Sequence, residues 1–283
     1  MGSSLTKLLS SYPEKYSVLS PASSALDITD AGSVNSFMAS ADGHIDIIVN
    51  CAAYTAVDNA ENDIEAATRL NAYAPAILAE AANTHQCKLL HISTDYVFSG
   101  DANTPVDEAA ATAPQSVYGK TKLLGEKKLA ETNPDAIILR TSWLYSECRS
   151  NFVKTILRLG HSKSAISVVY DQVGSPTYAG DLAQAIKSII DFGKWAPGVY
   201  HYSNEGVASW FDFAKAIFEL AAISSCTISP CLSCEYPTLA ARPHFSVLDK
   251  SKIKRTFNIS IPYWRDSLKV CINNMTTKNS IKL

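Results

Sequence analysis

The sequence predicts an α/β protein with a doubly wound parallel sheet and a small discontinuous lobe towards the C-terminus. Two observations support this prediction. Short apolar segments alternate with longer helical segments through the first two-thirds of the chain, and hydroxyl, amide and aromatic side chains follow several of the apolar segments. Strands that alternate with helices form a parallel sheet covered on both faces, and such sheets bind ligands beyond the carboxyl ends of their strands.

Each element follows from a local pattern. Short apolar runs predict strands at residues 16–20, 46–50, 88–93, 136–141 and 166–170. Longer segments rich in helix formers predict helices at residues 4–11, 62–85, 117–132 and 151–159. The spacing then loosens, with helices at residues 179–192, 209–222 and 263–274 and short strands at 198–202 and 226–229. We expect residues 1–170 to carry the sheet, and residues 171–283 to form mainly the lobe, with some segments returning to the core.

The composition is that of an ordinary globular protein. Of the 283 residues, 47% are hydrophobic and 18% are charged, which excludes disordered and fibrous classes. A formal net charge of −2 produces no field that would attract nucleic acid or an anionic membrane. No apolar run reaches the roughly 18 residues of a membrane span, and the N-terminus has no signal-peptide pattern. We therefore expect a cytoplasmic protein.

The seven cysteines are odd in number and scattered, which is typical of reduced thiols. Cys226, Cys231 and Cys234 have the C-x4-C-x2-C spacing of plant-type iron–sulfur proteins, with Cys271 as a candidate fourth ligand. Cluster loops are usually rich in glycine, whereas residues 227–230 have the pattern of a strand and a turn. The sequence therefore favours free thiols over a metal site.

Tyr118 and Lys122 form a Y-x-x-x-K motif within the helix predicted at residues 117–132. Residues four apart lie on one face of a helix, so the ammonium group would stand beside the phenol. A nearby cation favours the phenolate and strengthens tyrosine as a proton donor to a carbonyl or carbinol. The same ammonium group can hold the hydroxyls of a ribose.

Candidate ligand-binding residues follow three apolar strands. Thr94 ends one strand, small side chains follow Asn50 at the end of another, and Trp143 follows a third. Taken singly, Thr94 would serve equally well as a helix cap and Trp143 as a core residue. Because the carboxyl ends of parallel strands meet at one edge of the sheet, the three together indicate a single crevice.

These motifs together resemble the extended short-chain dehydrogenase/reductase superfamily and, within it, the family of dTDP-4-dehydrorhamnose reductases. The Y-x-x-x-K motif is common to the superfamily. The more specific motifs are S-T-D-Y-V-F at residues 93–98, R-T-S-W-x-Y at 140–145 and D-Q-x-G-x-P-T at 171–177. The resemblance implies a Rossmann-like NAD(P)-binding domain over residues 1–170 and a nucleotide-sugar substrate lobe over most of residues 171–283.

The resemblance also implies a mechanism. NADPH would give a hydride to C4 of dTDP-4-dehydro-L-rhamnose, yielding dTDP-L-rhamnose. Tyr118 would protonate the C4 alkoxide, Thr94 would polarise that oxygen, and Lys122 would bind the nicotinamide ribose and tune Tyr118. A non-catalytic nucleotide-binding regulatory relative, or another reductase or epimerase of the superfamily, stays open as an alternative. The intact Thr94, Tyr118 and Lys122 favour catalysis.

Residue roles come from the same resemblance. The residues implied to bind the cofactor are Gly2, Asp27, Ile28, Asn50, Ala52, Ala53, Thr55, Tyr118 and Lys122. Those implied to bind the dTDP-sugar are Val57, Thr94, Asp95, Tyr96, Trp143 and Arg242. Arg242 has the charge to hold the diphosphate, although a surface salt bridge would explain it equally well. Mg²⁺ and a homodimer are compatible with the resemblance, but neither can be derived from the sequence.

Two features bear on the cofactor. Residues 21–24, after the first predicted strand, contain no carboxylate that would bind the ribose of NAD and repel a 2′-phosphate, so NADPH is favoured while NADH stays open. Of the expected G-x-x-G-x-x-G turn, only Gly2 and the following helix are matched. We therefore expect the native polypeptide to begin about a dozen residues upstream of Met1. We also expect this 283-residue chain to bind NADPH weakly or not at all, because most of the Gly-rich turn is missing.

Overall fold

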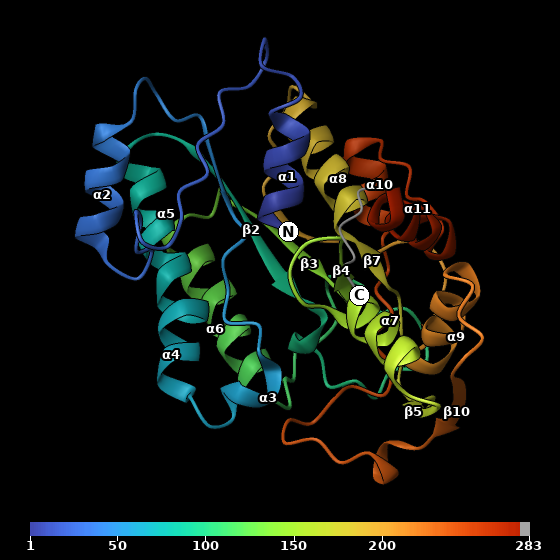
Figure 1. Ribbon diagram of the computed structural model, residues 1–283. Helices are drawn as coiled ribbons and strands as arrows, with labels where there is room; N and C mark the ends of the chain where they lie inside the picture. The colour runs from blue at the N-terminus through green and yellow to red at the C-terminus, as the bar shows by residue number, and fades with distance from the viewer. Residues whose placement is uncertain (278–283) are drawn as a thin grey trace.

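A parallel sheet runs through the centre of the molecule (Figure 1). The computed structural model describes residues 1–277. In this part of the chain the sheet has the order β1-β2-β3-β8, and every neighbouring pair is parallel. Its strands are β1 (Ile47–Asn50), β2 (Lys88–Thr94), β3 (Ile137–Thr141) and β8 (Gly198–His201). The α/β class and the parallel sheet predicted from the sequence are confirmed.

Helices cover both faces of the sheet, as Figure 1 shows. Side chains alternate between the faces of a strand, so Ile137 and Leu139 of β3 pack towards one layer and Ile138 towards the other. The first layer contains α1 (Gly2–Leu9) and α8 (Ala179–Asp191). The second contains α2 (Ala31–Ser40), α5 (Ala74–Thr84) and α6 (Val117–Thr132). The two central strands are consequently almost completely buried.

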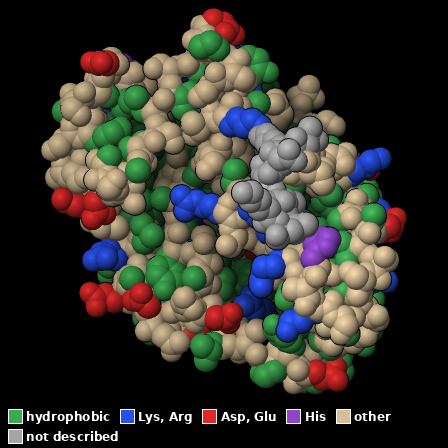
Figure 2. Space-filling model, viewed as in Figure 1, with side chains coloured by type: hydrophobic (Ala, Val, Ile, Leu, Met, Phe, Trp, Pro, Cys, Tyr) green, Lys and Arg blue, Asp and Glu red, His purple; other side chains and the backbone are tan. Residues whose placement is uncertain are grey.

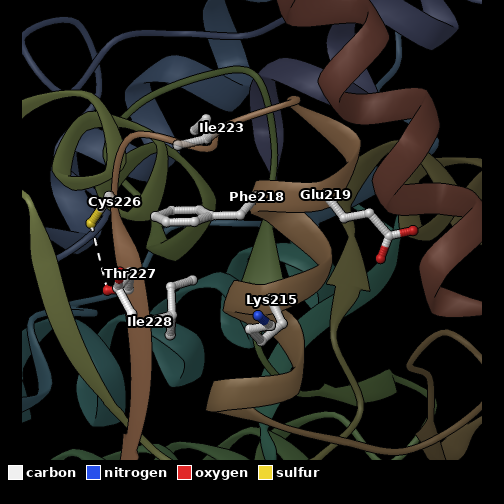
Figure 3. Close-up of a pocket in the computed structure, with 7 residues that line it drawn as sticks. All are labelled: Lys215, Phe218, Glu219, Ile223, Cys226, Thr227 and Ile228. Carbon is white, nitrogen blue, oxygen red and sulfur yellow. Dashed lines mark hydrogen bonds between the residues drawn. The ribbon is translucent and has the colours of Figure 1, made fainter.

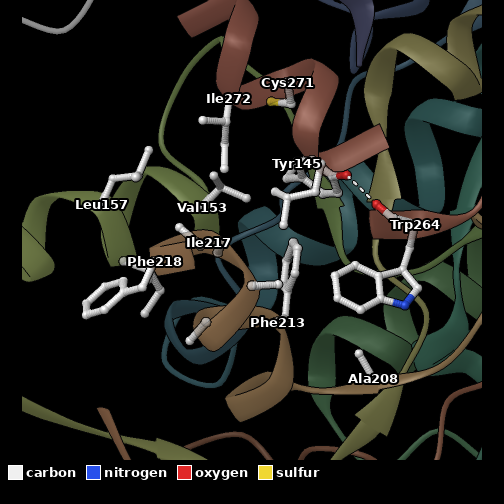
Figure 4. Close-up of a cluster of buried hydrophobic side chains, with 14 of the residues drawn as sticks. Tyr145, Val153, Leu157, Ala208, Phe213, Ile217, Phe218, Trp264, Cys271 and Ile272 are labelled. Atoms are coloured by element: carbon white, nitrogen blue, oxygen red, sulfur yellow. Dashed lines mark hydrogen bonds between the residues drawn. The ribbon is translucent and has the colours of Figure 1, made fainter. Parts of the chain in front are cut away.

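A second apolar cluster lies beside the sheet (Figure 4). Phe213, Ile217 and Trp264 are buried in it, together with Tyr145. The helices that pack around the cluster are α7 (Phe152–Ser162), α9 (Trp210–Leu220) and α11 (Trp264–Thr277). The parallel pair β5 (Ala165–Val169) and β10 (Thr227–Cys231) closes one side. This cluster gives the lobe a core of its own, while α8 and β8 return to the sheet.

Shorter elements complete the described chain. The short helices are α3 (Val57–Ala60), α4 (Ile64–Thr68) and α10 (Ser251–Phe257). The two-residue strands are β4 (Leu144–Tyr145), β6 (Val173–Gly174), β7 (Thr177–Tyr178) and β9 (Ala208–Ser209). The single-turn elements are a π-turn (Arg69–Tyr73) and two 3-10 turns (Asp95–Val97 and Ser233–Glu235).

Two predicted elements need correction. The strand expected at residues 16–20 is wrong: this segment has no regular secondary structure and pairs with no strand in the described chain. A strand forms only where another backbone satisfies its hydrogen bonds, and β1 lies at the edge of the sheet with no strand on its outer side among residues 1–277. The single helix expected at residues 62–85 is divided by the π-turn. Pro75, in the first turn of α5, has no N–H to continue the regular bonding pattern.

No helix within residues 1–277 is long and apolar enough to cross a membrane. The cysteines with iron–sulfur spacing differ in burial. Cys226 and Cys271 are buried in the apolar cluster of the lobe, whereas Cys234 is exposed.

Candidate active site

Thr94 is the last residue of β2 and caps the 3-10 turn that follows. Its hydroxyl accepts a hydrogen bond from the Tyr96 N–H at 3.2 Å and donates one to Asp95 Oδ1 at 3.0 Å. The capping role considered from the sequence is therefore real. It also holds the hydroxyl at the carboxyl end of a central strand, where parallel sheets bind ligands.

Helix α6 brings Tyr118 and Lys122 to the same end of the sheet. Ser116 caps the helix by accepting a hydrogen bond from the Gly119 N–H at 3.1 Å. The helix packs tightly here, because a Cβ added at Gly119 would lie 2.2 Å from the Tyr96 carbonyl oxygen. The Tyr96 and Tyr118 rings meet edge to face, with centroids 5.5 Å apart. Tyr118 therefore stands against the turn that Thr94 begins.

The environment of these groups shifts their proton affinities. Desolvation raises the pKa of Tyr118, while a hydrogen bond with Thr94 opposes that rise. Burial raises the pKa of Asp95 to about 6 and lowers that of Lys122 to about 8. Three groups that exchange protons in different pH ranges thus lie within one small region, an arrangement typical of acid–base catalysis.

Sequence reasoning missed the residue that joins β1 to α6. His91 of β2 is completely buried, with Nδ1 3.0 Å from Asn50 Nδ2 and Nε2 3.0 Å from Lys122 Nζ. Lys122 also donates to the Ile92 carbonyl oxygen at 2.7 Å. A polar residue inside the apolar run of residues 88–93 was the available signal, because buried imidazoles are generally hydrogen-bonded.

The other expected cofactor residues fall into two groups. Gly2 lies beside the end of β1, where a Cβ would stand 3.6 Å from the Cys51 Cβ. Ala52 and Thr55 are exposed on the segment after β1, and Ala53 is half-buried between them. In the second group, Asp27 is exposed and Ile28 packs against the apolar layer around α5. The described contacts connect neither Asp27 nor Ile28 with Thr94.

The segment that follows β1, together with Lys122, has side chains that fit a bound nicotinamide cofactor. Ala52 and Ala53 have small side chains that would let a flat ring approach the backbone, and Cys51 lies near Lys122. The ammonium group of Lys122 is thus near the same strand end as the small residues. Asn71 of the π-turn braces this segment, because its amide bonds both the N–H and the C=O of Tyr54.

Arg242 connects two of the segments that carry the expected substrate residues, the turn after β2 and the helix α3. Arg242 donates to the Tyr96 hydroxyl at 3.2 Å and forms a 2.6 Å salt bridge with Asp58. Val57, half-buried, begins the short helix that carries Asp58. The salt bridge considered from the sequence therefore exists, and it aims the guanidinium group at the tyrosine.

Trp143 occupies a constrained position at the lobe. Its backbone has φ +48°, and its ring stacks on Trp210 with centroids 3.5 Å apart. A Cβ at Gly174 would lie 2.6 Å from the Trp143 ring and 2.7 Å from the Ser246 hydroxyl. Gly174 of the D-Q-x-G-x-P-T motif is therefore required by close packing, and it places Trp143 near the 240s segment that also carries Arg242.

The surface around this site is hollowed. Figure 2 shows a hollow near the centre of the face seen in Figure 1, between α6 and α7, with Lys and Arg side chains beside it. A separate pocket between α9 and β10 shares no residue with the predicted site (Figure 3). Its lining residues are Lys215, Phe218, Glu219, Ile223, Cys226, Thr227 and Ile228. The groups that exchange protons are not in that pocket.

A parallel sheet with Thr94 at a central strand end, and Tyr118 and Lys122 on the adjoining helix, defines a Rossmann-type reductase of the short-chain dehydrogenase/reductase class. The family model described as "RmlD substrate binding domain" matches residues 1–277. The chain belongs to this family, and several similar relatives are named dTDP-4-dehydrorhamnose reductase. The family predicted from the motifs is confirmed.

Individual relatives are similar over most of the chain. The dTDP-4-dehydrorhamnose reductase of Mycolicibacterium smegmatis is 43% identical over 255 residues, covering 89% of this chain and 76% of the relative. The crystal structure of the Clostridium acetobutylicum enzyme has a TM-score of 0.92 and 38% identity, covering 97% and 95% of the two chains. That of the Bacillus anthracis enzyme, in complex with NADP, has a TM-score of 0.89 and 38% identity, covering 95% of each.

Proposed function

We propose that the protein reduces the C4 carbonyl of dTDP-4-dehydro-L-rhamnose to give dTDP-L-rhamnose, with NADPH as the reductant. The observation that carries this proposal is that Thr94 ends β2 while Tyr118 packs edge to face against Tyr96 of the turn that Thr94 begins. Family membership and the names of the relatives support the choice of substrate. They also favour the reductase over the non-catalytic alternative.

The chain's own residues supply the proton and the orientation. The bound nicotinamide supplies the hydride that reduces C4. Tyr118 then donates its phenolic proton to the C4 oxygen, and Thr94 holds that oxygen by a hydrogen bond. Tyr118 as a whole residue is only partly buried, while its hydroxyl is desolvated. The ammonium form of Lys122 favours the phenolate that remains after the proton has left.

Recognition of the nucleotide falls to the lobe side of the site. Arg242 has a planar guanidinium group that is suited to two phosphate oxygens, and Tyr96 and Asp58 fix its orientation. We assign Trp143 to the sugar, because its ring is held rigidly by Trp210. Asp95 completes the sugar contacts beside Thr94.

Replacement of Tyr118 by Phe tests the mechanism. We expect kcat, followed by the loss of NADPH absorbance with the keto sugar, to fall roughly 10²–10⁴-fold while the Kd of the sugar stays unchanged. Tyr170→Phe is the matched control, since that ring is 48% exposed at the end of β5. Undiminished turnover in Tyr118→Phe would remove Tyr118 from the reaction. Sugar binding without turnover by the wild type would favour a regulatory relative.

The finer assignments are also proposals. We assign NADPH rather than NADH, because residues 21–24 contain no carboxylate to repel a 2′-phosphate. Comparison of kcat/KM for the two cofactors tests this. Addition of EDTA to the assay tests whether activity requires Mg²⁺. Light scattering tests whether the protein is a homodimer, and microscopy of a labelled chain tests whether it is cytoplasmic.

A further inference from the structure

Asn50, His91 and Lys122 form a continuous chain of buried side chains that links β1, β2 and α6. Their exposed fractions are 5%, 0% and 1%. Each contact in the chain is 3.0 Å long, from Asn50 Nδ2 to His91 Nδ1 and from His91 Nε2 to Lys122 Nζ. Because the side chains contact one another directly and are buried, the hydrogens must be assigned consistently along the chain.

The backbone sets the first assignment. The Ala52 N–H donates to Asn50 Oδ1 at 3.0 Å, so the amide oxygen of Asn50 faces Ala52 and its NH₂ faces His91. Because that NH₂ donates, His91 Nδ1 must be the bare nitrogen. Burial lowers the pKa of His91 well below its ordinary value, so the ring is neutral and carries its single proton on Nε2.

This assignment leaves Lys122 with a particular role. An ammonium group has three donors and no lone pair, so it cannot accept the His91 Nε2–H. A neutral amine can accept that hydrogen and donate to the Ile92 carbonyl oxygen at 2.7 Å. The observed arrangement therefore matches the amine form of Lys122.

We infer that His91 is a positioning residue that couples the protonation of Lys122 to the backbone amide of Ala52. When Lys122 takes a proton from solvent, His91 must move its own proton from Nε2 to Nδ1 so that Nε2 can accept from the ammonium group. The Asn50 amide then rotates to accept from Nδ1–H. That rotation withdraws the Asn50 oxygen from the Ala52 N–H, which becomes free to bind an acceptor atom of a ligand.

The groups around Lys122 allow it to change between its amine and ammonium forms. Burial lowers the pKa of Lys122 to about 8, and Glu126 on the same helix partly opposes this. Glu126 is itself held by Arg140 at 2.7 Å. On the segment that follows β1, desolvation raises the pKa of the Cys51 thiol to about 11, so this thiol stays neutral where Lys122 exchanges its proton.

The consequence deepens the proposed function, because Ala52 lies among the residues assigned to the cofactor. The ammonium form of Lys122, which favours proton donation by Tyr118, is also the form in which the Ala52 N–H is available. A ligand that accepts from Ala52 thus favours protonated Lys122, and the reverse holds by linkage.

Nitrogen NMR of ¹⁵N-histidine-labelled protein without any ligand tests the coupling. His91 is assigned among the six histidines by the signal that His91→Gln removes. Above the Lys122 pKa of about 8 we expect a bare Nδ1 and a protonated Nε2, and below it the reverse, with no imidazolium signal. The Ala52 amide proton should shift with the same midpoint. A protonated Nδ1 at all pH values, or an Ala52 amide that does not respond, overturns the inference.

The variant Asn50→Asp provides a second test by the same NMR measurement. A carboxylate has two acceptors, one for the Ala52 N–H and one for His91 Nδ1–H, so it should hold the second tautomer at every pH. Unchanged signals from the other five histidines show that the variant is folded. A pH-dependent tautomer in this variant contradicts the inference. Since both arms use the ligand-free chain, they do not depend on whether the protein turns over the proposed sugar.

Discussion

Arg140 of β3 and Glu126 of α6 form a buried ion pair, with 2.7 Å between Nη2 and Oε2 and only 6% and 5% of the side chains exposed. A second bond, from Arg140 Nε to Glu126 Oε1 at 3.0 Å, makes the contact bidentate. Glu126 lies one turn beyond Lys122 and two turns beyond Tyr118. The pair therefore fixes the rotation of the helix that presents the reactive groups to the end of the sheet.

Breaking this pair should be costly. Glu126→Gln leaves the buried Arg140 charge without a counterion, and we expect the free energy of unfolding to fall by about 3–5 kcal/mol. Urea denaturation measures the loss. Glu219→Gln is the control, because its pair with Arg265 is largely exposed and should contribute less than about 1 kcal/mol. Equal losses in both variants would contradict the structural role of the pair.

Asp95→Asn should change how stability depends on pH. Burial raises the pKa of Asp95 to about 6, above its unfolded value, so its stabilising contribution is complete at low pH and is lost as the pH rises from about 4 to about 6. Across this pH range, the free energy of unfolding of the variant should rise by roughly 2–3 kcal/mol relative to that of the wild type. Urea denaturation at a series of pH values measures the difference.

Asp27→Asn provides the opposite control for that experiment. Hydrogen bonds from the Thr29 N–H and hydroxyl lower the pKa of Asp27. The ionised carboxylate therefore stabilises the folded protein as the pH rises, and the variant should lack this stabilisation. If both variants respond to pH with the same sign, the assignment of Asp95 as a destabilised buried acid is wrong.

Gly125 of α6 should not tolerate a side chain. A Cβ there would lie 2.0 Å from the Asn71 carbonyl oxygen in the π-turn. Alanine normally stabilises a helix interior relative to glycine, but here the clash should destabilise the protein by about 1–3 kcal/mol. Thermal unfolding measures it. Gly32→Ala in α2, where a Cβ meets ordinary contacts starting at 3.4 Å, should be nearly neutral. A stabilised Gly125→Ala would show that this helix can move away.

Arg242→Ala should separate binding from chemistry. The loss of a charged hydrogen bond to phosphate, about 1.5–3 kcal/mol, predicts an increase of roughly 10–100-fold in the KM of the nucleotide sugar with a smaller effect on kcat. Steady-state kinetics measure both constants. Arg265→Ala, which breaks an exposed pair of α11, controls for the loss of a positive charge. An unchanged KM would show that Arg242 does not bind the diphosphate and serves only in its salt bridge with Asp58.

Much of the fold follows from local sequence. The helix expected at residues 117–132 is found at Val117–Thr132, and the strand expected at 88–93 ends one residue later at Thr94. Helix periodicity alone places Tyr118 and Lys122 on one face, because residues four apart always lie close together in a helix. The end of an apolar run likewise places Thr94 at a strand end. These relationships depend on neighbours in the chain, so the sequence determined them.

Contacts between distant segments were decided by the tertiary structure. His91 touches Lys122 across 31 residues and Asn50 across 41, and the buried Arg140–Glu126 pair joins a strand to a helix. Residues 16–20 have the composition of a strand, yet in the described chain they pair with no other strand. Spacing and composition describe what a segment can form by itself. The partners of a buried polar atom or a strand edge exist only after the chain has folded, so tertiary structure alone decides them.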